Sequence, residues 1–296
     1  MRNLTEKKIK DLELKANAIR QSIIEMLFLA GSGHTAGPLD MADIFTYLYF
    51  HALKHDPQKP EWIERDRLVL SNGHICPVLY ATMAHAGYFP VEELKTLRKF
   101  GSRLRQFGSR LQGHPHREFL PMLENSSGPL GSGLSQAVGM ALANRIDEGR
   151  SSQRQFYCLL GDGELDEGQN WEAFMLAGKE KIQNLTIIID RNNIQIDGFT
   201  EDVMPLEPLC KKLETFNLHV QEIDGHNFRS IDEAFGKARA VFDKPSVIVA
   251  QTIASKGVPQ FERKYEWHGK PPNKEEAMLA LKELRTFGGK IKNEHE

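Results

Sequence analysis

Two apolar stretches of this 296-residue chain each end in a polar run, and a helix-like stretch lies between them. Residues 156–160 are followed by Gly161-Asp162-Gly163, and residues 185–189 are followed by Asp190-Arg191-Asn192. Two parallel strands joined through a helix deliver their carboxyl ends to the same edge of one sheet. We therefore predict that Asp162 and Asn192 lie close together at that edge.

The residues at this edge indicate a metal-bridged diphosphate. Mg²⁺ prefers oxygen ligands and shares its shell with substrate phosphates and water. The Asp162 carboxylate, the Asn192 amide oxygen and the Ile194 carbonyl form such a set. Gly163 lets a phosphate approach the backbone closely, and a helix start beside it favours an anion. A lone Gly-Asp-Gly is equally compatible with a tight turn, and the second polar run favours the site.

The order of the other predicted elements indicates the fold class. Helices are predicted at residues 9–30, 39–53, 92–100, 134–147, 171–177, 211–216, 231–242 and 274–285. Strands are predicted at residues 67–70, 156–160, 185–189, 219–223 and 246–251. This alternation predicts an α/β fold, a doubly wound, mostly parallel sheet with helices on both faces. We expect one domain over residues 1–296, with an N-terminal helix and a C-terminal helical tail.

The composition limits the cellular compartment and the binding partners that the chain is expected to have. The net charge of -2 gives no indication of a nucleic acid partner or an anionic membrane surface. No apolar run approaches the ~20 residues that span a bilayer. Cys76, Cys158 and Cys210 are widely spaced and form no CxxC pair, which favours a reduced, cytoplasmic setting.

Several histidines occupy distinctive loops: His34, His74, His114 with His116, His226 and His268. Four of them follow glycine-rich or strand-end loops, which predicts a shared polar cleft. Imidazoles in such a cleft can move protons or donate to anions. Zinc is a less favoured interpretation, because the chain has neither a cysteine cluster nor an HExxH motif.

Eight motifs occur in an order that resembles the N-terminal, thiamine diphosphate-binding part of transketolase. The resemblance runs from about residue 10 to about residue 272. The motifs are Ser32-Gly33-His34, Ser71-Asn72-Gly73-His74, Gly113-His114-Pro115, Gly128-Pro129-Leu130-Gly131, Gly161-Asp162-Gly163, Asn192 with Ile196-Asp197-Gly198, Asp224-Gly225-His226 and Trp267-His268-Gly269.

The resemblance implies roles for these residues. Magnesium, or Ca²⁺ or Mn²⁺ as a substitute, would be bound by Asp162, Asn192 and the Ile194 carbonyl. Thiamine diphosphate would contact His74, Gly128, Leu130, Gly163, Asn192 and His268. The catalytic residues facing the ketose would be His34, His114 and His268. Glu167 would lie at a subunit interface. The chain departs from the family at Thr35, where a proline is usual, and at Lys256, which is shifted within its motif.

The resemblance also implies a partner. Transketolase has a pyrimidine domain and a C-terminal domain that have no counterpart in the present sequence. We therefore expect a split transketolase, in which a separate C-terminal subunit completes an α2β2 heterotetramer. The reaction would transfer a two-carbon glycolaldehyde unit from a ketose phosphate to an aldose phosphate. Either general pentose phosphate metabolism or a specialised sugar route is compatible with the sequence.

Two other functions are compatible with part of the pattern. The α-subunit of a 2-oxo acid dehydrogenase also uses thiamine diphosphate, but it is not expected to carry the Ser-Asn-Gly-His and Trp-His-Gly motifs. A non-catalytic cofactor-binding module is the other alternative. The retention of His34, His74, His114 and His268 argues against it, because binding alone does not require all four.

Overall fold

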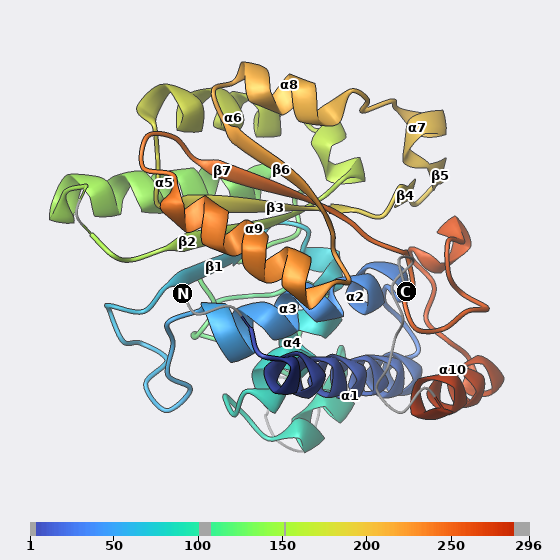
Figure 1. Ribbon diagram of the computed structural model, residues 1–296. Helices are drawn as coiled ribbons and strands as arrows, with labels where there is room; N and C mark the ends of the chain where they lie inside the picture. The colour runs from blue at the N-terminus through green and yellow to red at the C-terminus, as the bar shows by residue number, and fades with distance from the viewer. Residues whose placement is uncertain (1–3, 101–107, 151, 287–296) are drawn as a thin grey trace.

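The fold is built on a parallel β-sheet, seen in a computed structural model that describes residues 4–100, 108–150 and 152–286 (Figure 1). The strand order is β1-β2-β3-β7-β6. The strands are β1 (Arg67–Leu70), β2 (Phe156–Gly161), β3 (Leu185–Arg191), β6 (His219–Asp224) and β7 (Ser246–Gln251). All neighbouring pairs are parallel. Every predicted strand is therefore confirmed, and each observed strand ends within two residues of its prediction.

Helices cover both faces of this sheet, as predicted (Figure 1). One face carries α5 (Ser132–Glu148), α6 (Gly168–Glu180) and α8 (Leu209–Thr215). The other carries α9 (Phe228–Ala240) and, beyond it, α1 (Glu6–Ala30), α3 (Ala42–Tyr47), α4 (Cys76–His85) and α10 (Lys274–Thr286). The doubly wound α/β class is confirmed. Residues 287–296, the rest of the predicted helical tail, lie outside the described residues.

The central strands are apolar because helices bury them on both sides. Every residue of β3 is buried, and β2 is buried up to its last residue, Gly161. Such a continuous apolar run is typical of a parallel strand covered on two faces. The register pairs Gly161 of β2 with Asp190 of β3. Asp162 and Asn192 therefore leave the sheet at the same edge, as the sequence predicted.

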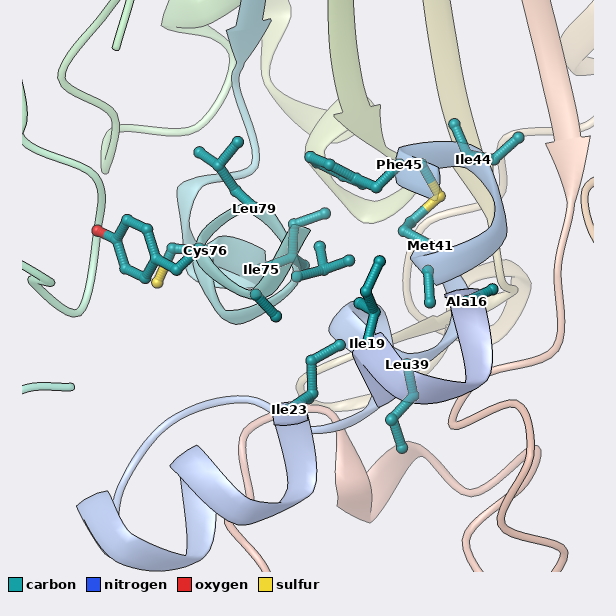
Figure 2. Packing of buried hydrophobic residues seen from close by; sticks show 14 of the residues in the cluster. Ala16, Ile19, Ile23, Leu39, Met41, Ile44, Phe45, Ile75, Cys76 and Leu79 are labelled. Carbon is teal, nitrogen blue, oxygen red and sulfur yellow. The ribbon is translucent and has the colours of Figure 1, made fainter. Parts of the chain in front are cut away.

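A second apolar cluster holds the N-terminal segment in place. Ile19 and Ile23 of α1 lie toward Phe45 of α3 and Ile75 beside α4 (Figure 2). The chain leaves α1 at Gly31, which has a φ of 64° and closes the helix in a left-handed conformation. The following segment runs directly into α2 (Ala36–Asp40). The packing of α1 therefore fixes the position of the loop that carries His34.

Two helix predictions were wrong. The helix predicted at residues 39–53 is divided into α2, α3 and a π-helical turn at Leu48–Ala52. The break lies at Met41, whose ψ of 0° is not helical. The helix predicted at 92–100 is a 3₁₀ segment, Val91–Thr96. It cannot continue as an α-helix, because Arg98 adopts a left-handed φ of 57°.

One short hairpin was missed by the sequence analysis. The segment after β3 was expected to be irregular, yet it contains β4 (Ile194–Gln195), β5 (Gly198–Phe199) and α7 (Thr200–Val203). β4 and β5 pair in antiparallel fashion around Ile196 and Asp197. The Asp-Gly pair that marks many hairpins is offset by one residue here, because Asp197 is the second turn residue and Gly198 begins β5. This hairpin forms one side of the site described below.

The described helices also bear on membrane association. α1 is 25 residues long, but charged and polar residues are distributed along it. Within the described ranges, no helix combines the length and the apolar character required to cross a bilayer.

Candidate functional site

A cavity of about 270 Å³ lies beyond the carboxyl ends of β2 and β3. Ligands of open α/β sheets bind at this edge. The residues to which the resemblance assigned metal, cofactor or catalytic contacts all line this one cavity: His34, His74, His114, Gly128, Leu130, Asp162, Gly163, Asn192, Ile194 and His268. They come from widely separated segments of the chain, so the fold brings the predicted set together.

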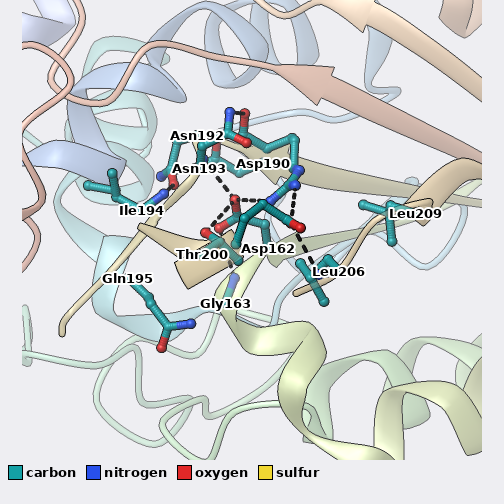
Figure 3. Close-up of polar contacts among 12 residues, drawn as sticks. Asp162, Gly163, Asp190, Asn192, Asn193, Ile194, Gln195, Thr200, Leu206 and Leu209 are labelled. Carbon is teal, nitrogen blue, oxygen red and sulfur yellow. Dashed lines mark hydrogen bonds and ion pairs between the residues drawn. The ribbon is translucent and has the colours of Figure 1, made fainter. Parts of the chain in front are cut away.

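Asp162 is anchored at the start of the turn after β2. Its side chain is 2% exposed and accepts hydrogen bonds through both oxygens (Figure 3). Oδ1 accepts from the Gly163 amide at 2.8 Å. Oδ2 accepts from the Asn193 amide at 2.8 Å, from the Arg191 guanidinium at 3.1 Å and from the Thr200 hydroxyl at 3.2 Å. Burial nevertheless raises the pKa of Asp162 to about 6, so the site favours an added positive charge.

Asn192 lies between two carboxyl groups. Its amide nitrogen donates to Asp40 at 3.0 Å and to Asp190 at 3.2 Å. Its amide oxygen accepts from the Ile194 amide at 3.1 Å. Burial raises the pKa of Asp190 to about 7 and also raises the pKa of Asp40. The sequence analysis did not identify Asp40 or Asp190 as site residues, although Asp190 stands two positions before Asn192.

The donor chemistry of the cavity fits a hard cation and a diphosphate. Asp162, Asn192 and the Ile194 backbone supply oxygen atoms, which Mg²⁺ prefers. Asn72 lines the same cavity, and its buried Oδ1 has no hydrogen-bond donor among the described residues. A polar group buried without a partner is costly, so a bound group that donates to it would be stabilised. A Cβ at Gly163 would lie 2.9 Å from Gln195 Cβ, and only glycine fits there.

Three histidine rings pack against one another at the cavity. The His34 centroid lies 4.9 Å from that of His74 and 5.5 Å from that of His268, and His74 and His268 are 5.1 Å apart. Burial, followed by the neighbouring His268, lowers the pKa of His34 to about 4. Burial also lowers the pKa values of His74, His114 and His268. At neutral pH these imidazoles are therefore uncharged, and each can accept or donate a proton.

The lowered pKa of His34 predicts a pH-dependent stability. At pH 7 both folded and unfolded chains hold His34 neutral. Between about pH 6.5 and pH 4 the unfolded chain takes up a proton that the folded chain does not, so stability falls as pH falls. We expect H34Q to lose less stability than the wild type between pH 7 and pH 5. Urea unfolding at both pH values measures this, and an equal loss in both proteins would contradict the pKa shift.

Two side chains join the loops that form the cavity. Thr35 is buried, and its hydroxyl donates to the Lys270 carbonyl at 2.6 Å, which ties the His34 loop to the His268 loop. The departure from the usual proline therefore leaves this turn anchored. Glu164 accepts from the Ser71 hydroxyl, from the Gly131 amide at 2.6 Å and from the Gly161 amide at 3.1 Å. It connects the loops that follow β1 and β2 with the start of α5.

Several residues that the motifs singled out lie elsewhere. His226 Nδ1 donates to the Asp43 carboxylate at 2.8 Å, and its Nε2 accepts from the Ile253 amide at 2.8 Å, so both ring nitrogens are occupied by structural contacts. His226 therefore does not line the cavity that His34, His74, His114 and His268 share. Lys256 is buried, and among the described residues it is not part of the lining. Glu167 is exposed at the start of α6, and its predicted interface role stays a prediction.

The fold and the site together define a class of protein. An α/β sheet presents a carboxylate, an amide oxygen, a glycine-rich turn and neutral histidines at one edge. This arrangement is typical of enzymes that hold a diphosphate cofactor through a divalent cation.

The comparisons with known proteins identify the family. The family model described as transketolase, thiamine diphosphate binding domain, matches residues 12–290. The 6-deoxy-6-sulfo-D-fructose transketolase subunit SqwG of Clostridium sp. (strain MSTE9) is 42% identical, over 94% of this chain and 98% of the relative. An apulose-4-phosphate transketolase subunit of Actinobacillus succinogenes is 39% identical, over 93% of this chain and 96% of the relative. The chain belongs to the transketolase family, as its sequence motifs predicted.

Solved structures agree with this assignment. A crystal structure of transketolase from Campylobacter jejuni superposes with a TM-score of 0.84 at 36% identity, covering 93% of this chain and 42% of that protein. Transketolase from Leishmania mexicana gives a TM-score of 0.84 at 33% identity, covering 96% of this chain and 42% of that protein. The chain therefore corresponds to less than half of these longer transketolases, and to nearly the whole length of the subunit-sized relatives.

Proposed function

We propose that this chain is the N-terminal, cofactor-binding subunit of a two-subunit transketolase. The observation that carries the proposal is the cavity at the sheet edge, which is lined by all the residues assigned metal, cofactor or catalytic contacts from the resemblance. The reaction is the transfer of a two-carbon glycolaldehyde unit from a ketose phosphate to an aldose phosphate. The family assignment favours this function over that of a 2-oxo acid dehydrogenase α-subunit or a non-catalytic module.

The residues of the cavity have separate tasks in this proposal. Asp162, Asn192 and the Ile194 carbonyl hold Mg²⁺. The remaining cofactor contacts come from His74, Gly128, Leu130, Gly163 and His268. Thiamine diphosphate, when bound, supplies the electron sink for cleavage of the carbon–carbon bond. The chain contributes orientation and a largely buried, preorganised environment of hydrogen-bond donors and acceptors.

The histidines handle protons in this proposal. His34, His114 and His268 face the ketose, and lowered pKa values keep their imidazoles neutral at pH 7. A neutral imidazole can accept the proton of a substrate hydroxyl and return it later in the cycle. The contact between the rings of His34 and His268 places two such groups within one substrate's reach.

A second subunit completes the enzyme in this proposal, as an α2β2 heterotetramer. Support comes from the two relatives of comparable length, which are both named as transketolase subunits. The cavity rim supports it as well. Ile196 lines the cavity yet is 63% exposed, Phe199 is exposed in the same hairpin, and Met204 is exposed directly after α7. Exposed apolar residues gathered beside a site are typical of an interaction surface.

The cellular compartment and the extent of the domain are also proposals. We infer that residues 1–296 form a single thiamine diphosphate-binding domain. Three free cysteines, of which Cys76 and Cys158 are buried, support a reduced, cytoplasmic setting. The sugar phosphates that serve as donor and acceptor are not specified by the described residues. The two relatives are named for two different sugars, which supports a specialised substrate as readily as a general one.

The proposal is tested by reconstitution. The purified chain is mixed with thiamine diphosphate, Mg²⁺, a ketose phosphate and an aldose phosphate, with and without a separately expressed C-terminal transketolase subunit. We expect turnover only when the metal and both subunits are present. Omission of Mg²⁺ with added chelator is the control. Substantial turnover by this chain alone would refute the division of the enzyme between two subunits.

A further inference from the structure

Asp40 contacts the metal-ligand candidate Asn192 from a distant part of the chain. It is the last residue of α2, it is 0% exposed, and its Oδ2 accepts a hydrogen bond from Asn192 Nδ2 at 3.0 Å. The two residues are 152 positions apart in sequence. The contact therefore depends on the packing that places α2 against the sheet edge.

The hydrogen-bond pattern sets the orientation of the Asn192 amide. Nδ2 donates to carboxyl oxygens of Asp40 and Asp190, while Oδ1 accepts from the Ile194 amide. An amide has two donors on its nitrogen and only acceptors on its oxygen. A flipped amide would set Oδ1 against two carboxyl groups and Nδ2 against an N–H group. The flipped form loses three hydrogen bonds, so the oxygen stays on the side of Ile194.

The two carboxyl groups that accept from Asn192 are held in place differently. Asp190 belongs to β3 and is already held by the Thr252 hydroxyl at 2.5 Å, so its position follows from the sheet. Asp40 comes from a different layer, and its approach brings a second acceptor to the Asn192 amide. A single acceptor would leave the other amide hydrogen unpaired in a partly buried setting, which is unfavourable.

We propose that Asp40 is a positioning residue that presents the Asn192 amide oxygen to the bound divalent cation. The inference deepens the proposed function and rests on it. Groups that hydrogen-bond to metal ligands orient them, and their removal typically weakens metal binding about 10- to 100-fold. Asp40 acts through Asn192 in this role and does not itself touch the substrate.

Two variants separate positioning from ionisation. D40N keeps an acceptor oxygen for Asn192 and keeps a donor that can face Asp190, while it cannot ionise. D40A removes the acceptor entirely. We expect D40A to bind Mn²⁺ about tenfold more weakly or worse, and D40N to retain most of the wild-type affinity. The measurement is an electron paramagnetic resonance titration of Mn²⁺ into the full chain with saturating thiamine diphosphate.

The control variant is D66A. Asp66 is a buried aspartate at the amino end of β1, far along the strand from the site, and it accepts from the Lys54 and Gln155 amides, each at 2.9 Å. D66A should lower stability in urea unfolding without changing Mn²⁺ affinity. Wild-type affinity in D40A would overturn the inference, as would equally weak binding by D40A and D40N. Absence of Mn²⁺ binding by the wild type would instead refute the metal site of the proposed function.

Discussion

Replacing Asp162 by asparagine is expected to abolish turnover of the reconstituted enzyme, with a loss of more than about a hundredfold. Residues behind a metal ligand already contribute about 10- to 100-fold to metal binding, and a charged ligand contributes more. Asp162 is the carboxylate of the proposed ligand set, and it sits where the turn after β2 meets the hairpin after β3. The activity of D162N as a function of Mg²⁺ concentration measures the effect.

The choice of asparagine separates metal binding from folding. Asp162 also pairs with the buried Arg191, which keeps Glu201 and Glu207 as further partners. Asparagine retains the shape and one acceptor oxygen, so the turn should hold. D147N, exposed near the end of α5 and outside the cavity lining, also removes one carboxylate and should leave activity unchanged. Near-wild-type turnover and Mg²⁺ dependence in D162N would rule out Asp162 as a metal ligand.

The strands and the residues directly after them could be predicted from the sequence. Buried parallel strands are continuous apolar runs, and the residues that follow them gather at one edge by topology alone. Asp162 and Asn192 are examples, because the pairing of Gly161 with Asp190 follows once β2 and β3 are known to be neighbours. The order of eight motifs then indicated which loops accompany them.

Residues that reach the site through tertiary packing could not be predicted. Asp40 ends a short helix with no local signal for a metal site, and its contact with Asn192 appears only when α2 is packed. Glu164 directly follows the first polar run, but its three donors are Ser71 after β1, Gly161 at the end of β2 and Gly131 in the glycine-rich turn. The sequence shows that Asp40 and Glu164 are polar, but their hydrogen-bond partners are determined by the tertiary fold.

The wrong prediction of one helix over residues 39–53 has a similar origin. The composition of residues 39–53 is apolar enough for one long helix, and periodicity does not register a single non-helical ψ at Met41. That break separates α2, which ends at Asp40, from α3.

Replacing Gly133 by alanine is expected to destabilise the protein by about 1–3 kcal/mol, because added atoms overpack a filled site. Gly133 is the second residue of α5, and its amide donates to the Ser71 hydroxyl at 3.1 Å. A Cβ there would lie 2.6 Å from Ser71 Cα, a backbone atom that cannot rotate away. α5 must then shift from the loop after β1, which also moves Gly131 and weakens cofactor binding.

A matched control in the same helix is expected to raise the stability of the protein. Gly139 is exposed in α5, and a Cβ there would meet nothing within 4 Å. G139A should therefore stabilise the protein by roughly 0.5–1 kcal/mol, the difference in helix propensity between glycine and alanine. Urea unfolding of both variants, with thiamine diphosphate titrated by calorimetry, measures stability and cofactor affinity together. Equal stability of G133A and G139A would show that α5 and the Ser71 loop are not in tight contact. The cavity would then lack the rigid wall on which the cofactor contacts of Gly128 and Leu130 depend.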